Sequence, residues 1–166
     1  MIWPSSLVLA HFIVNYETDG KRILEIGCGM ALSSLLLNKQ NADITATDYH
    51  PEVQRFLQRN TLLNGDDAIS FELVDWLSTG DNLGLYDLII GSDLLYEDEH
   101  TELLANFIKK HSNLKCEVII VDPGRGRKNK LSTKMIEFGF SSSQYKPSHT
   151  GYLEEGFKGH ILKFER

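Results

Sequence analysis

The stretch RILEIGCGMALSS, residues 22–34, decides how this chain folds. Its apolar run ending at Ile26 predicts a buried strand, which stops at Gly27. Gly29 follows two residues later, and a helical pattern begins at about Ala31. A strand that passes into a helix through a glycine-rich turn is a common support for nucleotide-like ligands. The stretch therefore predicts the start of an α/β fold with a ligand beside the glycine loop.

Strand-like and helix-like segments alternate along most of the chain. A helix from Ser5 or Ser6 to about Tyr16 comes first. The expected strands are RILEIG (22–27), DITATD (43–48), ISFELVDW (69–76), YDLIIGS (86–92) and CEVIIVD (116–122). The expected helices between and after them cover residues 31–39, 51–63, 99–111 and 128–138. Such alternation predicts a parallel sheet with helices on both faces.

The last two extended segments have no helical pattern between them. They are SSSQYKP (141–147) and HILKFER (160–166), and their connection contains Gly151, Gly156 and Gly159. An antiparallel hairpin is the simplest interpretation. The predicted fold is therefore α/β, a Rossmann-like, seven-stranded, mostly parallel sheet with a C-terminal antiparallel hairpin. A length of 166 residues fits a single domain over residues 1–166.

Composition and charge restrict the classes of function. A net charge of −6 argues against a broad nucleic-acid surface. The apolar run LVLAHFIV (7–14) is shorter than the about 20 residues of a membrane helix and lacks the features of a signal peptide. Cys28 and Cys116 are expected at opposite edges of the sheet, which argues against a disulfide and for a cytoplasmic protein. The histidines show no metal-ligand spacing, so no metal site is predicted.

Acidic residues gather where the predicted parallel strands end. Right-handed crossovers place all these ends at one edge of the sheet, where open α/β sheets bind their ligands. The edge would carry Glu25, Asp48, Asp75, Asp93 and Asp122. Single aspartates often only start turns or cap helices. The set of five favours a ligand site.

The glycine loop narrows the choice of ligand. A dinucleotide fingerprint needs a glycine where this chain has Leu32, and the Gly-Lys-Ser/Thr end of a phosphate loop is absent. The spacing fits the G-x-G-x-G of methyltransferases, with Ala31 in the third place. Glu25 suits a ligand with an ammonium and a sulfonium better than a pyrophosphate. Asp48 is placed to accept hydrogen bonds from ribose hydroxyls, which NAD and S-adenosylmethionine share.

Asp75 and Trp76 favour an adenosyl ligand. The carboxylate can accept hydrogen bonds from the adenine amino group, and the indole can pack on the purine ring. The alternative is that Trp76 belongs to the core and that Asp75 only starts a turn. The neighbouring glycine loop and Asp48 make the ligand interpretation the stronger one.

These residues together resemble a class I S-adenosylmethionine-dependent methyltransferase. More narrowly, the chain resembles methyltransferase family 16, the seven-β-strand protein lysine methyltransferases. The matching pieces are IWPSSLVLAHFI (2–13), LEIGCGMALSS (24–34), TATDYHPEV (45–53), VDW (74–76) and YDLIIGSDLLYED (86–98). VIIVDPGRGR (118–127) and MIEFGF (135–140) continue the pattern weakly. Many members carry an extension before the W-P pair, whereas in this chain the pair begins at Trp3. Because of this departure, the resemblance indicates the cofactor more firmly than the substrate.

The resemblance implies roles for individual residues. The cofactor S-adenosyl-L-methionine would be bound by Trp3, Glu25, Gly27, Cys28, Gly29, Asp48, Tyr49, Asp75, Trp76 and Ser92. Asp93 and Tyr96, the D-x-x-Y pair, would face the incoming nucleophile, which would be a protein lysine amine. By composition alone, DLLYED (93–98) is an ordinary helix start with acidic residues at its positive end.

Three alternatives stay open beside the protein lysine methyltransferase. In the first alternative, the methyl acceptor is a small molecule or a nucleic acid. In the second, the chain is a catalytically silent module that binds S-adenosylmethionine or a partner. A nicotinamide oxidoreductase is disfavoured by Leu32 and by the lack of room for a catalytic domain. The basic run GRGRKNK (124–130) would dock an acidic partner or RNA, or would simply be a solvated helix entrance, which is the preferred interpretation.

Overall fold

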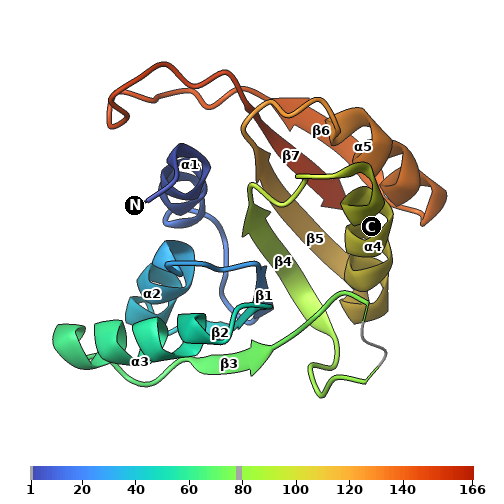
Figure 1. The fold of residues 1–166 in the computed structure, drawn as a ribbon. Helices are drawn as coiled ribbons and strands as arrows, with labels where there is room; N and C mark the ends of the chain where they lie inside the picture. Colours follow the sequence, from blue (N-terminus) through green and yellow to red (C-terminus); the bar gives the residue numbers. More distant parts are fainter. Residues whose placement is uncertain (1, 78–79) are drawn as a thin grey trace.

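The computed structural model describes residues 2–77 and 80–166 and shows a sheet between two layers of helices (Figure 1). The helices are α1 (Pro4–Ile13), α2 (Leu32–Lys39), α3 (Glu52–Asn64), α4 (Asp98–His111) and α5 (Lys128–Glu137). The strands are β1 (Arg22–Ile26), β2 (Asp43–Asp48), β3 (Ser70–Leu73), β4 (Tyr86–Ser92), β5 (Ser112–Asp122), β6 (Ser141–Tyr145) and β7 (His160–Glu165). None of the helices in this described part has both the length and the apolar character needed to cross a bilayer.

The seven strands form one sheet in the order β3-β2-β1-β4-β5-β7-β6. β1 to β5 are parallel, and β7 is antiparallel to both β5 and β6. This confirms the predicted fold, including the C-terminal hairpin. The strand order reverses between β1 and β4, which is where ligands bind in open α/β sheets. The ends of β1, β2, β3 and β4 at this edge carry the predicted site.

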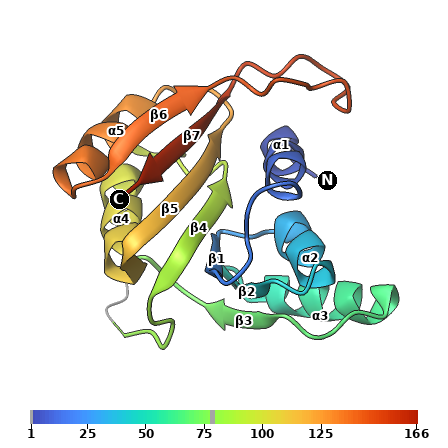
Figure 2. The same ribbon diagram turned by 180° about the vertical axis from the view of Figure 1, so that it is seen from behind.

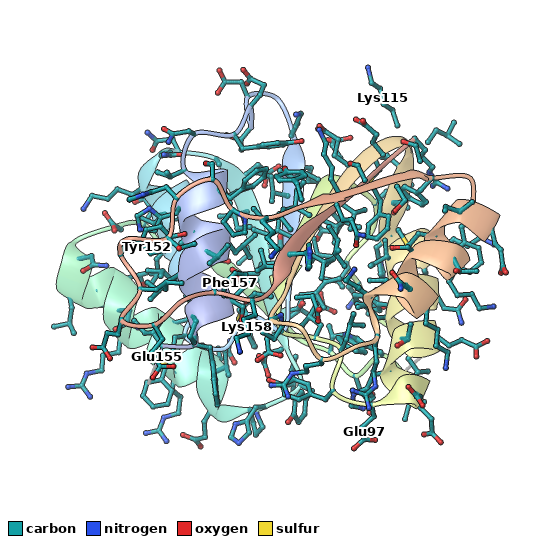
Figure 3. The ribbon with its side chains drawn as sticks, turned by 90° about the horizontal axis from the view of Figure 1, so that it is seen from above. Glu97, Lys115, Tyr152, Glu155, Phe157 and Lys158 are labelled. Carbon is teal, nitrogen blue, oxygen red and sulfur yellow. The ribbon has the colours of Figure 1, made fainter. Side chains whose placement is uncertain are left out.

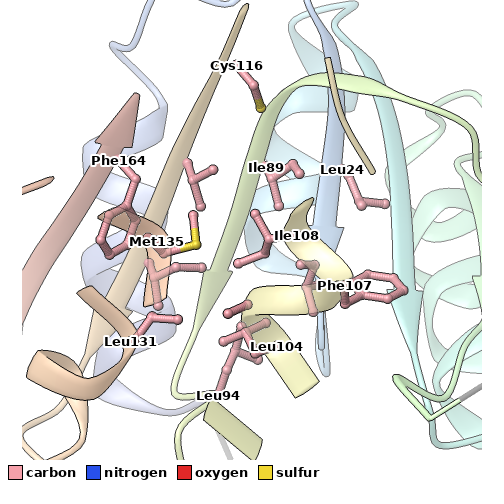
Figure 4. Close-up of a cluster of buried hydrophobic side chains, with 14 of the residues drawn as sticks. Leu24, Ile89, Leu94, Leu104, Phe107, Ile108, Cys116, Leu131, Met135 and Phe164 are labelled. Carbon is pink, nitrogen blue, oxygen red and sulfur yellow. The ribbon is translucent and has the colours of Figure 1, made fainter. Parts of the chain in front are cut away.

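The helices cover both faces of the sheet. α1, α2 and α3 lie on one face and α4 and α5 on the other (Figure 2). Under α4 and α5, alternate strand residues such as Leu24, Ile89 and Phe164 form the largest apolar cluster (Figure 4). A second cluster, under α1 and α2, contains the strand residues whose side chains point to the other face of the sheet, among them Ile23 and Ile90. This double burial explains why the strands read as nearly continuous apolar runs.

Some element boundaries differ from the prediction. α1 begins at Pro4, because proline is well suited to the first helical position, and ends at Ile13 rather than near Tyr16. β3 ends at Leu73, the last residue paired with β2, so Asp75 and Trp76 lie beyond the strand. β5 begins at Ser112, directly after α4 and earlier than the predicted start at Cys116. Cys28 and Cys116 are both free and buried.

The loop of residues 146–159 joins β6 to β7 at the carboxyl edge of the parallel strands. It lies across α1, as the positions of Tyr152 and Phe157 show in Figure 3. The ring of Tyr152 stacks on that of His11 with centroids 3.6 Å apart and planes 6° apart. Tyr152, Leu153 and Phe157 pack against the apolar cluster under α1. This loop therefore covers the start of the chain beside the predicted site.

Candidate functional site

The glycine loop between β1 and α2 is built from left-handed backbone conformations. Gly27 and Gly29 have φ values of 58° and 51°, and Ala31 follows with a φ of 55°. A Cβ at Gly27 would lie 2.6 Å from Cδ2 of Leu94, so a larger residue would force the buried Leu94 side chain to move. A Cβ at Gly29 would meet no atom within 4 Å. The space beside Gly29 is therefore open to a ligand.

The end of β2 holds the glycine loop in place. The backbone N–H of Cys28 donates to the carbonyl of Thr47 at 2.9 Å. The N–H of Gly29 donates to Oδ2 of Asp48, also at 2.9 Å, and the N–H of His50 donates to Oδ1 at 2.9 Å. Asp48 is thereby fixed at the rim and is 8% exposed. Each of its oxygens keeps a further lone pair for a ligand hydroxyl.

Glu25 lies beneath the loop rather than on its surface. Its side chain is 4% exposed, and its Oε2 accepts hydrogen bonds from the N–H of Ser34, at 3.0 Å, and from the Ser34 hydroxyl. Burial raises the pKa of Glu25 to about 7, although the Ser34 hydrogen bonds lower it. In this structure Glu25 holds the first turn of α2 under the loop, and its contact with a ligand ammonium stays a prediction.

The predicted adenine and ribose residues lie near the end of β3 and just after β2. Asp75 is exposed and its Oδ1 accepts a hydrogen bond from the N–H of Leu77 at 3.0 Å, so it does start a turn. Trp76 is half-buried against the main core, with its ring 6.0 Å from that of His100 in an edge-on contact. Tyr49 is 76% exposed. Asp75 and Tyr49 are therefore accessible to a ligand, and Trp76 is shared with the core.

The first turn of α1 closes another side of the site. The hydroxyls of Ser6 and Ser92 lie 3.2 Å apart and tie α1 to the end of β4. Trp3, the residue before α1, is 54% exposed. The motifs at the start of the chain and at the end of β4 are thus brought together.

The D-x-x-Y pair is joined by a third residue, Arg125. Asp93 follows β4 with a φ of 53° and is 6% exposed. The Arg125 guanidinium donates from Nε to Oδ1 of Asp93 at 2.6 Å and from Nη2 to Oδ2 at 3.1 Å. Its Cζ lies 4.4 Å from the centroid of the Tyr96 ring. Burial first, and then the Asp93 carboxylate, raise the pKa of the Tyr96 phenol.

Arg125 was not predicted as a site residue. The only sequence signal was the run GRGRKNK, interpreted as a solvated helix entrance. Its other cations have partners within the chain: Arg127 pairs with Asp98 at 3.1 Å, Lys128 donates to Gln144 at 2.9 Å, and Lys130 donates to the carbonyl of Asp98 at 3.4 Å. The run is therefore held by intramolecular contacts, and one member of it, Arg125, belongs to the site.

The fifth carboxylate of the rim, Asp122, is buried and interacts electrostatically with Asp93 and Arg125. Asp122 is 1% exposed, and its Oδ2 accepts a hydrogen bond from the N–H of Gly124 at 3.1 Å. Its Oδ1 has no hydrogen-bond partner within the part of the chain that the structure describes. Burial raises the pKa of Asp122.

A hollow of about 850 Å³ opens beside Asp93. Its walls come from the start of α1, the turn after β5 and the loop of residues 146–159, and its lining includes Trp3, Asp93 and Arg125. A smaller hollow of about 300 Å³ lies at the opposite edge, where β1, β2 and β4 begin. Of the residues predicted for the site, Trp3 and Asp93 line the larger hollow, whereas the glycine loop, Asp48 and Asp75 lie outside its lining.

A family model described as lysine methyltransferase matches residues 1–137. The chain belongs to this family. It is 32% identical to the histidine protein methyltransferase 1 homolog of Dictyostelium discoideum over 124 residues, 69% of this chain and 40% of that protein. It is also 32% identical to protein N-lysine methyltransferase METTL21A of Danio rerio over 110 residues, 60% of this chain and 49% of that protein. The chain thus spans less than half the length of these two relatives.

Solved structures of methyltransferases share the fold of this family member. One from Pyrococcus furiosus has a TM-score of 0.74 and 22% identity, and the match covers 95% of this chain and 82% of that one. Magnesium protoporphyrin IX methyltransferase from Synechocystis, determined with bound SAM, has a TM-score of 0.72 and 19% identity, over 98% of this chain and 77% of that one. These similarities confirm the Rossmann-like architecture.

Proposed function

We propose that this chain transfers a methyl group from S-adenosylmethionine to a protein amine, and that this amine is the side chain of a lysine. The observation that carries the proposal is the position of Asp93 and Tyr96 at the end of β4. Asp93 and Arg125 line the large hollow, and the ring of Tyr96 lies against the Arg125 guanidinium. Membership of the lysine methyltransferase family supports the same reaction.

The residues around the glycine loop have the chemistry to hold S-adenosylmethionine. The space beside Gly29 is open, and Asp48 presents carboxylate lone pairs that suit a ribose diol. Asp75 offers an exposed acceptor for an adenine amino group, and Tyr49 an exposed ring. When bound, S-adenosylmethionine would supply the methyl group, which is electrophilic because it is attached to a sulfonium. The chain's own part is to position the two reactants.

Asp93 and Tyr96 would bind and orient the acceptor. A carboxylate that is 6% exposed attracts a lysine ammonium, and the face of Tyr96 offers a cation–π contact. Partial desolvation in the hollow lowers the pKa of the amine, whereas the Asp93 carboxylate raises it. As the nitrogen is methylated it gains positive charge, which Asp93 stabilises. Asp93 therefore acts first by positioning and charge stabilisation, and only second as a proton acceptor.

A second candidate is methylation of a different protein side chain. Relatives of this chain include a histidine protein methyltransferase homolog and, at 31% identity, the histone-arginine methyltransferase METTL23 of Rattus norvegicus. The site also holds a guanidinium in this structure, that of Arg125, against Asp93. Histidine and arginine are therefore the alternatives to lysine that the experiment must separate.

The deciding experiment supplies the chain with radiolabelled S-adenosylmethionine and a cell lysate. We expect label in protein, and lysine as the labelled amino acid after hydrolysis. Asp93→Asn is the matched control and should transfer no label. Label in small molecules or RNA would contradict the proposal, and label in histidine or arginine would favour the second candidate. Calorimetry should show binding of S-adenosylhomocysteine and not of NAD.

We also propose that the chain works in the cytoplasm. Support comes from the two cysteines, which are free and buried. Fractionation of cells that express the tagged chain tests this placement, and recovery in an oxidising compartment would contradict it.

A further inference from the structure

The ion pair between Asp93 and Arg125 has the geometry of a strong interaction. Its two parallel hydrogen bonds, of 2.6 and 3.1 Å, match the bidentate arrangement of guanidinium and carboxylate. Asp93 is 6% exposed, so water screens this carboxylate poorly. The carboxylate assigned to the acceptor amine is therefore already neutralised by a residue of the chain itself.

The same guanidinium also covers the ring of Tyr96, with its Cζ 4.4 Å from the ring centroid. This distance lies within the range of cation–π contacts. The proposed mechanism assigns two contacts to an acceptor ammonium, the Asp93 carboxylate and the face of Tyr96. Arg125 makes both of them at once.

We propose that Arg125 occupies the position of the acceptor cation and that the protein amine must displace it to reach Asp93 and Tyr96. Arg125 is then a specificity-determining residue. The inference rests on the proposed function, because it takes the D-x-x-Y pair as the binding group of the acceptor. It goes beyond that function by assigning a role to a residue outside the D-x-x-Y motif.

The backbone around Arg125 suits such a displacement. Gly124 and Gly126 flank it with φ values of 104° and 85°, which other residues rarely adopt. A Cβ at Gly126 would meet no atom within 4 Å. The Arg125 side chain is 36% exposed. Its guanidinium can therefore leave Asp93 without any change in the packed core.

The hollow beside Arg125 can receive the displaced guanidinium. Arg125 and Asp93 both line it, together with Glu154, Glu155 and Lys158 of the loop of residues 146–159. The loop thus contributes two carboxylates and one ammonium to the space into which the guanidinium would move.

The displacement selects against small amines. Displacing Arg125 costs the free energy of its ion pair with Asp93. A free amine can offset this cost only through its own contacts with Asp93 and Tyr96. A lysine on a protein surface adds contacts between that surface and the walls of the hollow, and these can offset the cost. Arg125 would thereby restrict methylation to amines that a protein partner presents.

The test uses the full chain saturated with S-adenosylhomocysteine and a blocked lysine, Nα-acetyl-lysine methylamide, as the probe. Arg125→Gln removes the competing charge, and we expect calorimetry to show about tenfold tighter binding of the probe than for the wild type. Arg125→Lys keeps the charge but loses the bidentate geometry, so its affinity for the probe should lie between those of the wild type and Arg125→Gln. Lys128→Gln is the matched control, since it removes one positive charge from the same basic run and loses a hydrogen bond to Gln144, and it should bind the probe as the wild type does.

The outcomes separate this inference from the proposed function. Absence of S-adenosylhomocysteine binding by the wild type would contradict the proposed function itself. If that ligand binds but Arg125→Gln takes up the probe no more tightly than the wild type, Arg125 does not compete with the acceptor. A second readout needs no variant: the Nε–H resonance of Arg125 should shift when the probe is added to the labelled wild type. An unchanged resonance at saturating probe would overturn the proposal.

Discussion

The side chain of Asp48 accepts a hydrogen bond from the backbone N–H of Gly29 at 2.9 Å, so the end of β2 fixes the glycine loop that follows β1. The same carboxylate caps the turn after β2 through the N–H of His50. Asp48 thus has a structural role in addition to the proposed contact with ribose. The loop and its carboxylate are already arranged before any ligand binds, which reduces the cost of ordering them on binding.

Replacing Asp48 by asparagine should separate these two roles. The asparagine oxygen can satisfy only one of the two N–H groups, so we expect a loss of stability of about 1–2 kcal/mol. Affinity for S-adenosylhomocysteine should fall by about tenfold or more, because the charged acceptor for the ribose is lost. Thermal unfolding and calorimetry measure the two effects. Unchanged affinity would remove Asp48 from the ligand site.

Glu25 should make the stability of the protein depend on pH. Its folded pKa of about 7 lies above the ordinary value of 4.5, so its contribution is full below pH 4.5 and is lost as the pH rises through 7. Glu25→Gln removes this titration and can keep both hydrogen bonds from Ser34. We expect the variant to match the wild type at pH 4 and to exceed it by at most about 3 kcal/mol at pH 8. Urea unfolding at both values tests this, and a pH-independent difference would contradict it.

Asp75 offers a way to separate turn formation from adenine binding. Its Oδ1 caps the N–H of Leu77, and a serine hydroxyl can do the same. Asp75→Ser should therefore keep the thermal stability of the wild type and lose affinity for S-adenosylhomocysteine by about five- to tenfold. Asp75→Ala should lose both. Equal affinity in the wild type and the serine variant would show that Asp75 only starts the turn.

Asp93→Asn should abolish turnover without loss of S-adenosylhomocysteine binding. Asparagine tolerates the positive φ of this position, 53°, so the variant should fold. We expect methyl transfer to fall at least about 100-fold, because the charge that stabilises the methylated nitrogen is gone. Tyr96→Phe keeps the ring and should cost less than Asp93→Asn. Transfer at the wild-type rate by Asp93→Asn would exclude Asp93 from the chemistry.

The fold followed from local signals. The glycine turn at residues 27–29, the apolar strands and the three glycines of residues 151–159 were sufficient to predict the parallel sheet and its hairpin. Boundaries were less predictable, because they depend on pairing partners. β3 ends where β2 stops pairing with it at Leu73, and β5 begins earlier because Ser112 pairs with Tyr86.

The site was predicted in outline, and two parts of it were not. The sequence placed Asp93 and Tyr96 at the rim, but the pairing of Asp93 with Arg125 joins residues 32 positions apart in two separate loops. No periodicity or short motif reports such a contact. The same holds for Glu25, whose burial depends on how Ser34 in α2 packs beneath the loop.

Residues 152–158 of the loop between β6 and β7 all line the hollow. Among them, Tyr152 and Phe157 also pack against the cluster under α1, whereas Glu154 and Glu155 are exposed. The family match stops at residue 137, ahead of this hairpin. Substitution of the two glutamates would thus change the lining of the hollow without altering the two anchoring rings or the sheet. Substitutions at these two positions would therefore be the simplest way to change the protein substrate, because the rest of the fold could stay as it is.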